Sequence, residues 1–206
     1  MRPISKTQEL MQEQHAPPPL GKIVFSAEDI AHAVGRLGRE IRARNAGRPL
    51  LLVGVLKGAL PFAADLMREL GDYPLTIDFM VVSSYGTGRE GEVDVRLLKD
   101  LETSPSGRHV LLVEDIVDEG YTLSYLLDNL RSRKAASVQS CALIDKPFHR
   151  AVDVRPDYVG LRAPEDAFLV GYGLDFQEHF RNLPHIRQLH AGFHSRGLGD
   201  SETARG

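Results

Sequence analysis

The chain has 206 residues, of which 42% are hydrophobic and 26% are charged, and its formal net charge is −3. This length can bury one full core, and the lack of a basic excess argues against nucleic acid as a partner. A single cysteine excludes an internal disulfide, and no apolar stretch has the length of a membrane span or a signal peptide, so a cytoplasmic location is the default.

Composition divides the chain into three parts. Residues 1–21 are polar and then proline-rich, which predicts a flexible leader or a strap on a partner subunit. Residues 22–191 alternate apolar and polar segments and predict a single domain. Residues 192–206 form a polar tail to which the sequence assigns no role.

Two early segments carry apolar residues at helical spacing. Just before the first, Ser26 and Asp29 resemble a capping box, in which each side chain bonds the backbone of the other residue. Pro61 stands where the second segment begins, and proline is tolerated only in the first turn of a helix. The apolar positions are Ile30, Val34, Leu37 and Ile41 in the first helix, and Phe62, Leu66 and Leu70 in the second.

Short apolar runs predict strands at Leu50–Leu56, Thr76–Val82, Val110–Val113, Val138–Ile144, Tyr158–Leu161 and Phe168–Val170. A further helix is expected from Thr122, where leucines repeat at helical spacing. The alternation of strands and helices predicts an α/β fold with a parallel, twisted sheet and flanking helices. The glycine-rich, charged stretch from Ser83 to about Asp94 is too polar to pack and is expected to form a loop.

Four carboxylates follow one of these strands within six residues: Glu114, Asp115, Asp118 and Glu119, with Gly120 directly after them. At the end of a parallel strand these groups repel one another unless a ligand neutralises them, whereas the amides that lead into the next helix attract an anion. A phosphorylated, polyhydroxyl ligand that arrives with a divalent cation satisfies both requirements. The alternative, that the acids merely cap a helix, needs only one of them.

The segment VLLVEDIVDEGYTLSYLL resembles the phosphoribosyl-pyrophosphate signature of the type I phosphoribosyltransferases. Four neighbouring segments resemble motifs of the hypoxanthine-guanine branch in the expected order: LLVGVLKGALPFAADL the pyrophosphate loop, VVSSYGTGREGEV the mobile catalytic loop, ALIDKPFHR the purine-recognition strand, and FLVGYGLDFQEHFRNLPHI the closing segment. The resemblance runs from about Ile23 to about Leu189. It implies the type I phosphoribosyltransferase fold with a small hood subdomain formed by the terminal segments, and a homodimer or homotetramer.

The resemblance also implies which residues bind phosphoribosyl pyrophosphate: Lys57, Gly58, Glu114, Asp115, Asp118, Glu119, Gly120, Tyr121, Thr122 and Arg181, with Ser124 beside the 5′-phosphate. In the family a cis peptide often precedes the lysine at the position of Lys57, and this lysine contacts the diphosphate, as does Arg181. Glu114 and Asp115 hold the ribose hydroxyls. Glu119 departs from the pattern, because many relatives carry a small hydroxyl residue there, and we expect its side chain to face solvent.

The implied cofactor is magnesium, held by Glu114, Asp115 and Asp175, partly through water. Asp118 is the implied base that accepts the purine proton. Ser84 and Tyr85 belong to the implied catalytic loop, which excludes water from the reacting carbon.

The implied purine-binding residues are Lys146, Phe168, Leu169 and Asp175. A fixed ammonium only donates hydrogen bonds, so Lys146 suits a purine with an oxygen at position six and disfavours adenine. In the family Phe168 stacks on the base, and Leu169 offers a backbone carbonyl. The sequence alone explains Phe168 equally well by core packing, and Asp175 with Arg181 by a surface ion pair.

The implied function is transfer of the 5-phosphoribosyl group from phosphoribosyl pyrophosphate to hypoxanthine or guanine in purine salvage. One alternative is a non-catalytic regulator of the same fold that senses phosphoribosyl pyrophosphate and binds nucleic acid, which the absent basic excess disfavours. Another is a zinc protein that uses late histidines, namely His179, His185, His190 and His194, of which only the last two have i,i+4 spacing.

Overall fold

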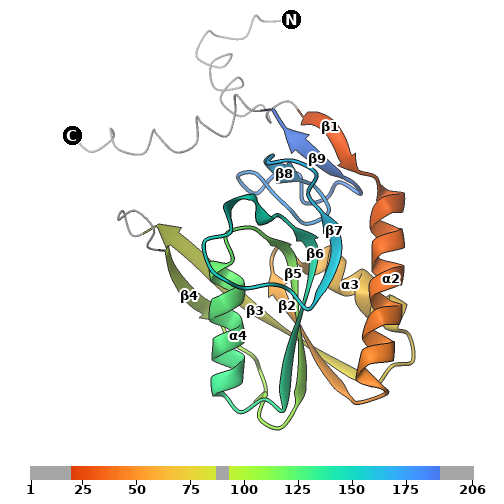
Figure 1. Cartoon of the computed structure of the whole chain (residues 1–206), viewed down its shortest axis with the longest axis vertical. Helices are drawn as coiled ribbons and strands as arrows, with labels where there is room; N and C mark the ends of the chain where they lie inside the picture. The colour runs from red at the N-terminus through yellow and green to blue at the C-terminus, as the bar shows by residue number, and fades with distance from the viewer. Residues whose placement is uncertain (1–19, 87–92, 191–206) are drawn as a thin grey trace, which may run out of the picture.

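The computed structural model describes residues 20–86 and 93–190, and of residues 84–86 and 93 it describes the backbone alone. A central sheet has the strand order β4-β3-β2-β5-β6-β7, and every neighbouring pair is parallel except β3 and β4 (Figure 1). The strands are β2 Leu50–Leu56, β3 Leu75–Gly86, β4 Val93–Lys99, β5 His109–Val117, β6 Ser137–Asp145 and β7 Tyr158–Arg162. The predicted α/β fold with a largely parallel sheet is confirmed.

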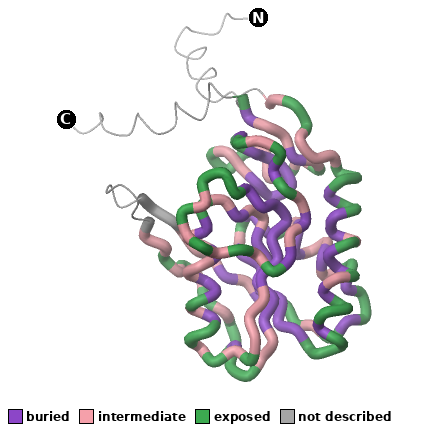
Figure 2. The backbone as a smooth tube through the Cα atoms, in the orientation of Figure 1, coloured by how far each residue is buried: buried purple, intermediate pink, exposed green. Residues whose placement is uncertain are grey.

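Helices cover both faces of this sheet, as Figure 2 shows by the buried strands between the helices. The helices are α2 Ala27–Asn45, α3 Leu60–Leu70, α4 Tyr121–Ser132 and the short η1 Pro147–His149. Leu50 and Leu52 of β2 pack in a cluster with α2 and α3, whereas Leu51 and Val53 pack in a second cluster with α4. Because successive side chains of a strand point to opposite faces, a continuous apolar run fits a strand covered on both sides. Among the described residues, no helix is both long and apolar enough to cross a membrane.

A second, antiparallel sheet joins the two ends of the described chain, in the order β1-β9-β8. Its strands are β1 Leu20–Phe25, β8 Leu169–Val170 and β9 Ile186–Leu189. It lies beyond the carboxyl ends of β2, β5 and β6 (Figure 1), where a hood made of the terminal segments is expected. The limits of leader, domain and tail stay predictions, and β1 begins at Leu20, inside the range assigned to the leader.

Two predicted strands run further than the sequence indicated, and β1, β4 and β9 were not predicted as strands. β5 continues past Val113 to Val117, so Glu114 and Asp115 lie within the strand rather than after it. β3 continues to Gly86 and pairs with β4, which the sequence did not reveal. The polar composition of residues 83–94 concealed this hairpin, because an edge strand pairs through its backbone and can carry charged side chains.

The predicted capping box at the start of α2 is confirmed. The Asp29 amide donates to Ser26 Oγ at 3.1 Å, and the Ser26 amide donates to Asp29 Oδ2 at 2.8 Å. These two bonds satisfy donors that the first turn of a helix otherwise leaves unpaired.

We predict that Ser26→Ala lowers the free energy of unfolding by about 1 kcal/mol, because it removes the acceptor for the Asp29 amide. Urea unfolding monitored by circular dichroism measures this change. The control is Ser132→Ala at the C-terminal end of α4, where the exposed hydroxyl donates to the Asn129 carbonyl and its loss should cost less than ~0.5 kcal/mol. Equal losses in both variants would contradict the role of the cap.

Candidate active site

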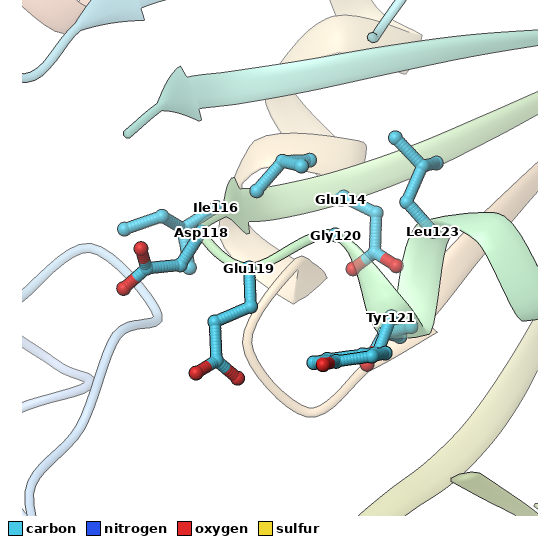
Figure 3. A pocket seen from close by; sticks show the side chains of 9 residues that line it. Glu114, Ile116, Asp118, Glu119, Gly120, Tyr121 and Leu123 are labelled. Atoms are coloured by element: carbon cyan, nitrogen blue, oxygen red, sulfur yellow. The ribbon is translucent and has the colours of Figure 1, made fainter. Parts of the chain in front are cut away.

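A pocket of about 190 Å³ opens at the carboxyl end of β5 (Figure 3). It is lined by Glu114 and residues 116–123, which comprise the end of the strand, the turn and the first turn of α4. Ligands of open parallel sheets bind at this edge. The acidic segment singled out in the sequence therefore lies beside a cavity.

Gly120 shapes the turn from β5 into α4. Its φ of +94° lies in the region that favours glycine, and a Cβ there would lie 2.7 Å from Val154 Cγ1. The first backbone bond of α4 runs from the Ser124 amide to the Gly120 carbonyl at 2.9 Å, and in the described part of the chain no side chain caps this helix end. The amide-rich, positive end of the helix dipole therefore suits a phosphate. Glu119 is exposed at the rim of this pocket, which confirms that it faces solvent (Figure 3).

Glu114 and Asp115 form the acidic wall of the site. Glu114 is 5% exposed, and its Oε1 has no hydrogen-bond partner among the described residues. Burial, and then repulsion by Asp115, raise the pKa of Glu114 well above its usual range. Burial also raises the pKa of Asp115 to about 6, although its carboxylate accepts a bond of 2.9 Å from the Ile116 amide. Acids in such a setting favour a ligand that donates hydrogen bonds or brings a cation.

Within residues 20–86 and 93–190, no three His, Cys, Asp or Glu side chains form a metal-holding group by themselves. This holds for the implied magnesium residues Glu114, Asp115 and Asp175, and for the histidines of the zinc interpretation up to His190; His194 lies outside the described residues. Magnesium commonly takes one or two carboxylates and completes its shell with water and substrate phosphates. The partnerless oxygen of Glu114, together with the carboxylate of Asp115, fits an ion bound in that way.

Three backbone segments meet tightly beside Asp115. The Leu56–Lys57 peptide is cis, as the resemblance implied. A Cβ on Gly58 would lie 1.7 Å from Asp115 Oδ2, and a Cβ on Gly173 would lie 1.9 Å from the Gly58 carbonyl oxygen. Only glycine allows the loop after β2, the acid of β5 and the closing segment to approach this closely.

The two cations implied for the diphosphate share one carboxylate. Lys57 Nζ lies 2.9 Å from Glu178 Oε2, and Arg181 Nη2 lies 3.2 Å from Glu178 Oε1. Arg181 also lies 2.8 Å from Asp175 Oδ1 and donates to the Gly173 carbonyl at 2.8 Å. Hydrogen bonds from Lys57 and from Arg181 lower the pKa of Glu178. A diphosphate bound here has to compete with Glu178 for both cations.

Lys146, which follows β6, lies between two carboxylates. It is 8% exposed, and its Nζ lies 3.0 Å from both Asp118 Oδ2 and Asp166 Oδ1. Burial acts to lower the pKa of Lys146, but the hydrogen bonds to Asp118 and Asp166 outweigh burial and raise it. Lys146 is therefore a charged donor, and Asp118 keeps one oxygen, Oδ1, without a hydrogen-bond partner in the described structure.

Phe168 is 39% exposed, which does not support the core-packing interpretation. Its ring meets that of Phe176 edge-on, with 5.7 Å between the ring centroids and 87° between the planes. Leu169, the next residue, is buried in β8. The ring of Phe168 is therefore exposed next to the second sheet, whereas the side chain of Leu169 packs into the core.

The structure gathers Lys57, Gly58, Asp115, Gly173 and Arg181 at one corner, and joins Asp118 to Lys146 at another. The side chains of Ser84 and Tyr85 lie outside the described residues, and their backbone pairs with Val95 and Asp94 of β4.

Two carboxylates of the site, Asp166 and Glu178, were not among the predicted residues; Asp166 holds Lys146, and Glu178 holds Lys57. Each lies more than ten residues from its cation in the chain, so no local pattern links the two.

Comparison with known proteins shows the family. Residues 22–177 match the model of the phosphoribosyl transferase domain. The chain is 48% identical over 168 residues to the hypoxanthine-guanine phosphoribosyltransferase of Bacillus subtilis, covering 82% of this chain and 92% of that protein. The chain belongs to the type I phosphoribosyltransferases. Its similarities place it in the hypoxanthine-guanine branch.

Other relatives agree. A hypoxanthine phosphoribosyltransferase structure from Staphylococcus aureus has a TM-score of 0.77 and 41% identity, covering 88% of this chain and 95% of that one. A structure from Trypanosoma cruzi, a K68R mutant in a ternary substrates complex, has a TM-score of 0.79 and 38% identity, covering 85% and 98%. The chain is also 49% identical over 165 residues to the bifunctional TilS/HprT protein of Listeria innocua, of which it spans 25% of the length.

We predict that Asp115→Asn stabilises the unliganded protein at neutral pH. The pKa of Asp115 is about 6 in the folded protein against 3.8 for an ordinary aspartate, so between these values the folded state holds more protons than the unfolded state. The free energy of unfolding contributed by this group therefore falls as pH rises through that window, and the loss persists above it. Removing the charge should recover about 1–3 kcal/mol at neutral pH.

Urea unfolding of Asp115→Asn and of the unchanged protein across this pH window measures the effect. The control is Asp128→Asn on α4, a side chain that is 75% exposed, which should leave the pH dependence as it is. A variant at position 115 with an unchanged slope, or with lower stability at neutral pH, would show that burial does not destabilise the charged form of Asp115.

Proposed function

We propose that this protein transfers the 5-phosphoribosyl group from phosphoribosyl pyrophosphate to a 6-oxopurine, hypoxanthine or guanine. The products are inosine or guanosine 5′-monophosphate and pyrophosphate, which makes the reaction one of purine salvage. One observation carries the proposal: the buried Glu114 with the half-buried Asp115, an anion-binding helix end and a charged lysine donor lie together at the carboxyl ends of the parallel strands. The relatives named hypoxanthine-guanine phosphoribosyltransferase in Bacillus subtilis and Streptococcus thermophilus support it.

The parts of the sugar donor match parts of the site. We assign the 5′-phosphate to residues 119–122 with Ser124, because the turn and the start of α4 favour an anion. The ribose hydroxyls are donors for the carboxylates of Glu114 and Asp115. The diphosphate belongs with Lys57, Gly58 and Arg181, where it replaces the carboxylate of Glu178 as the bridge between the two cations.

Magnesium is the proposed cofactor. Glu114 and Asp115, with Asp175, are the residues that would hold it, in part through water. When bound, magnesium neutralises charge on the departing diphosphate.

The chemistry is a displacement at the anomeric carbon of the ribose. The bond from this carbon to the diphosphate oxygen breaks, and a ring nitrogen of the purine forms the new bond and gives up its proton. Asp118 is the proposed acceptor of that proton, since its Oδ1 has no partner within the described structure. Lys146 donates to the six-oxo group, Phe168 stacks on the base, and Leu169 and Asp175 border it. We assign the exclusion of water to Ser84 and Tyr85.

We further propose that the protein acts in the cytoplasm as a homodimer or homotetramer. In the similar hypoxanthine phosphoribosyl transferase of Trypanosoma cruzi, the C-terminal region has a role in the oligomeric state and the enzymatic activity. Size-exclusion chromatography with light scattering tests the oligomer, and a monomer at micromolar concentration would contradict it.

We predict that Asp118→Asn lowers kcat by about 10²–10⁴-fold, because the purine proton loses its acceptor, while KM values change little. Steady-state kinetics with hypoxanthine and saturating sugar donor measure this. The matched control is Asp166→Asn, which also removes one carboxylate from Lys146 but leaves the proposed base in place, and it should reduce kcat much less. Equal losses would mean that Asp118 acts only by holding Lys146.

We predict that the unchanged protein uses hypoxanthine or guanine in preference to adenine by about 10⁴-fold in kcat/KM, since a donor-only lysine cannot accept a bond from adenine's amino group. Lys146→Gln, which carries both a donor and an acceptor, should reduce this ratio. Radiolabelled bases, including xanthine, provide the assay. Equal use of adenine would contradict the proposed role of Lys146, and binding of the sugar donor without any turnover would favour a non-catalytic sensor.

A further inference from the structure

The Arg150 side chain binds the turn between β5 and α4, where we propose that the phosphate binds, and the sequence predicted no role for it. It is 16% exposed, and its Nε donates to the Asp118 carbonyl at 2.7 Å while Nη2 donates to the Val117 carbonyl at 3.2 Å. A Cβ on Gly120 would lie 3.1 Å from Arg150 Cδ. The arginine thus packs directly against the turn that leads into α4.

Backbone amides close to Arg150 in the chain also donate hydrogen bonds to carbonyls of this turn. The Lys146 amide donates to the Val117 carbonyl at 2.9 Å, and the Ala151 and Val152 amides donate to the Glu119 carbonyl at 2.9 and 3.2 Å. Residues 146–152 therefore hold three successive carbonyls, those of residues 117, 118 and 119. All three are turned toward one side of the turn.

This arrangement fixes where the intervening amides point. In a trans peptide the N–H of one residue is antiparallel to the carbonyl of the residue before it, and the only cis peptide among the described residues is Leu56–Lys57. The N–H groups of residues 118, 119 and 120 must therefore point away from residues 146–152. Successive amides aimed to one side form an anion-binding nest.

We infer that Arg150 is a positioning residue for the phosphate site: it holds the carbonyls of Val117 and Asp118 behind the turn, and so directs the amides of the turn toward the ligand. This inference rests on the proposed function, because it takes the ligand to be the 5′-phosphate of the sugar donor. Arg150 itself does not touch the phosphate.

Two further bonds fix the guanidinium in place. Arg150 Nη2 lies 2.5 Å from Asp145 Oδ1, and both side chains are largely buried, at 16% and 11% exposed. Nη1 donates to the Val154 carbonyl at 2.5 Å. The planar fork of arginine serves four acceptors at once, and the single ammonium of lysine cannot reproduce that geometry.

The test compares inosine 5′-monophosphate with inosine, whose Kd values are measured by calorimetry or competition. The Kd of inosine divided by the Kd of inosine 5′-monophosphate reports what the 5′-phosphate contributes to binding. In Arg150→Lys we expect the ratio to fall by about 10–100-fold, because hydrogen bonds to a charged group are lost, while the Kd of inosine stays nearly the same. If Arg150 had a merely structural role, the Kd values of both ligands would rise by the same factor.

The matched control is Arg155→Lys, the same substitution at an exposed arginine shortly after residues 146–152, which should leave the ratio unchanged. If Arg150→Lys does not fold, Asp145→Asn tests the same anchor and should lower the ratio by a smaller factor. An unchanged ratio in a folded variant, or an equal loss for both ligands, overturns the inference. Failure of the unchanged protein to bind the nucleotide would instead contradict the proposed function.

Discussion

The site depends on two carboxylates of one central strand, neither of which has an ion-pair partner among the described residues. β5 lies between β2 and β6 and is covered on both faces, so Glu114 and Asp115 emerge directly from the core at the edge of the sheet. Burial raises the pKa of both groups, which means that their surroundings disfavour the charged forms. A ligand that brings hydroxyl donors and a cation relieves this cost, and binding to the folded state then stabilises the fold.

The cations of the site differ from these two acids, because each cation already has a carboxylate partner. Lys57 and Arg181 share Glu178, and Lys146 is held by Asp118 and Asp166. An anion that binds to one of these cations therefore has to replace a carboxylate that already holds it. Such a site favours ligands that supply negative charge for the cations and donors for the acids at the same time, and it disfavours simple anions that would leave the acids unpaired.

Local sequence signals predicted much of this architecture, and long-range contacts account for the rest. Ser26 and Asp29 predicted the start of α2, because a capping box is complete within four residues. The acids after Val113 predicted the site, because strand, turn and helix follow one another in the chain. The hairpin of β3 and β4 escaped prediction, since its pairing uses the backbone of a polar edge. Arg150 escaped because the carbonyls that it binds belong to the turn after β5, and Asp166 escaped because β7 separates it from Lys146 in the chain; local spacing carries no information about either contact.

The most direct test of the proposed function is a crystal structure with phosphoribosyl pyrophosphate and magnesium bound. The proposed function predicts ribose hydroxyls on Glu114 and Asp115, the 5′-phosphate at the turn around Gly120, and a diphosphate between Lys57 and Arg181 in place of Glu178. A sugar donor bound at another edge of the molecule, or a 5′-phosphate away from the start of α4, would contradict it.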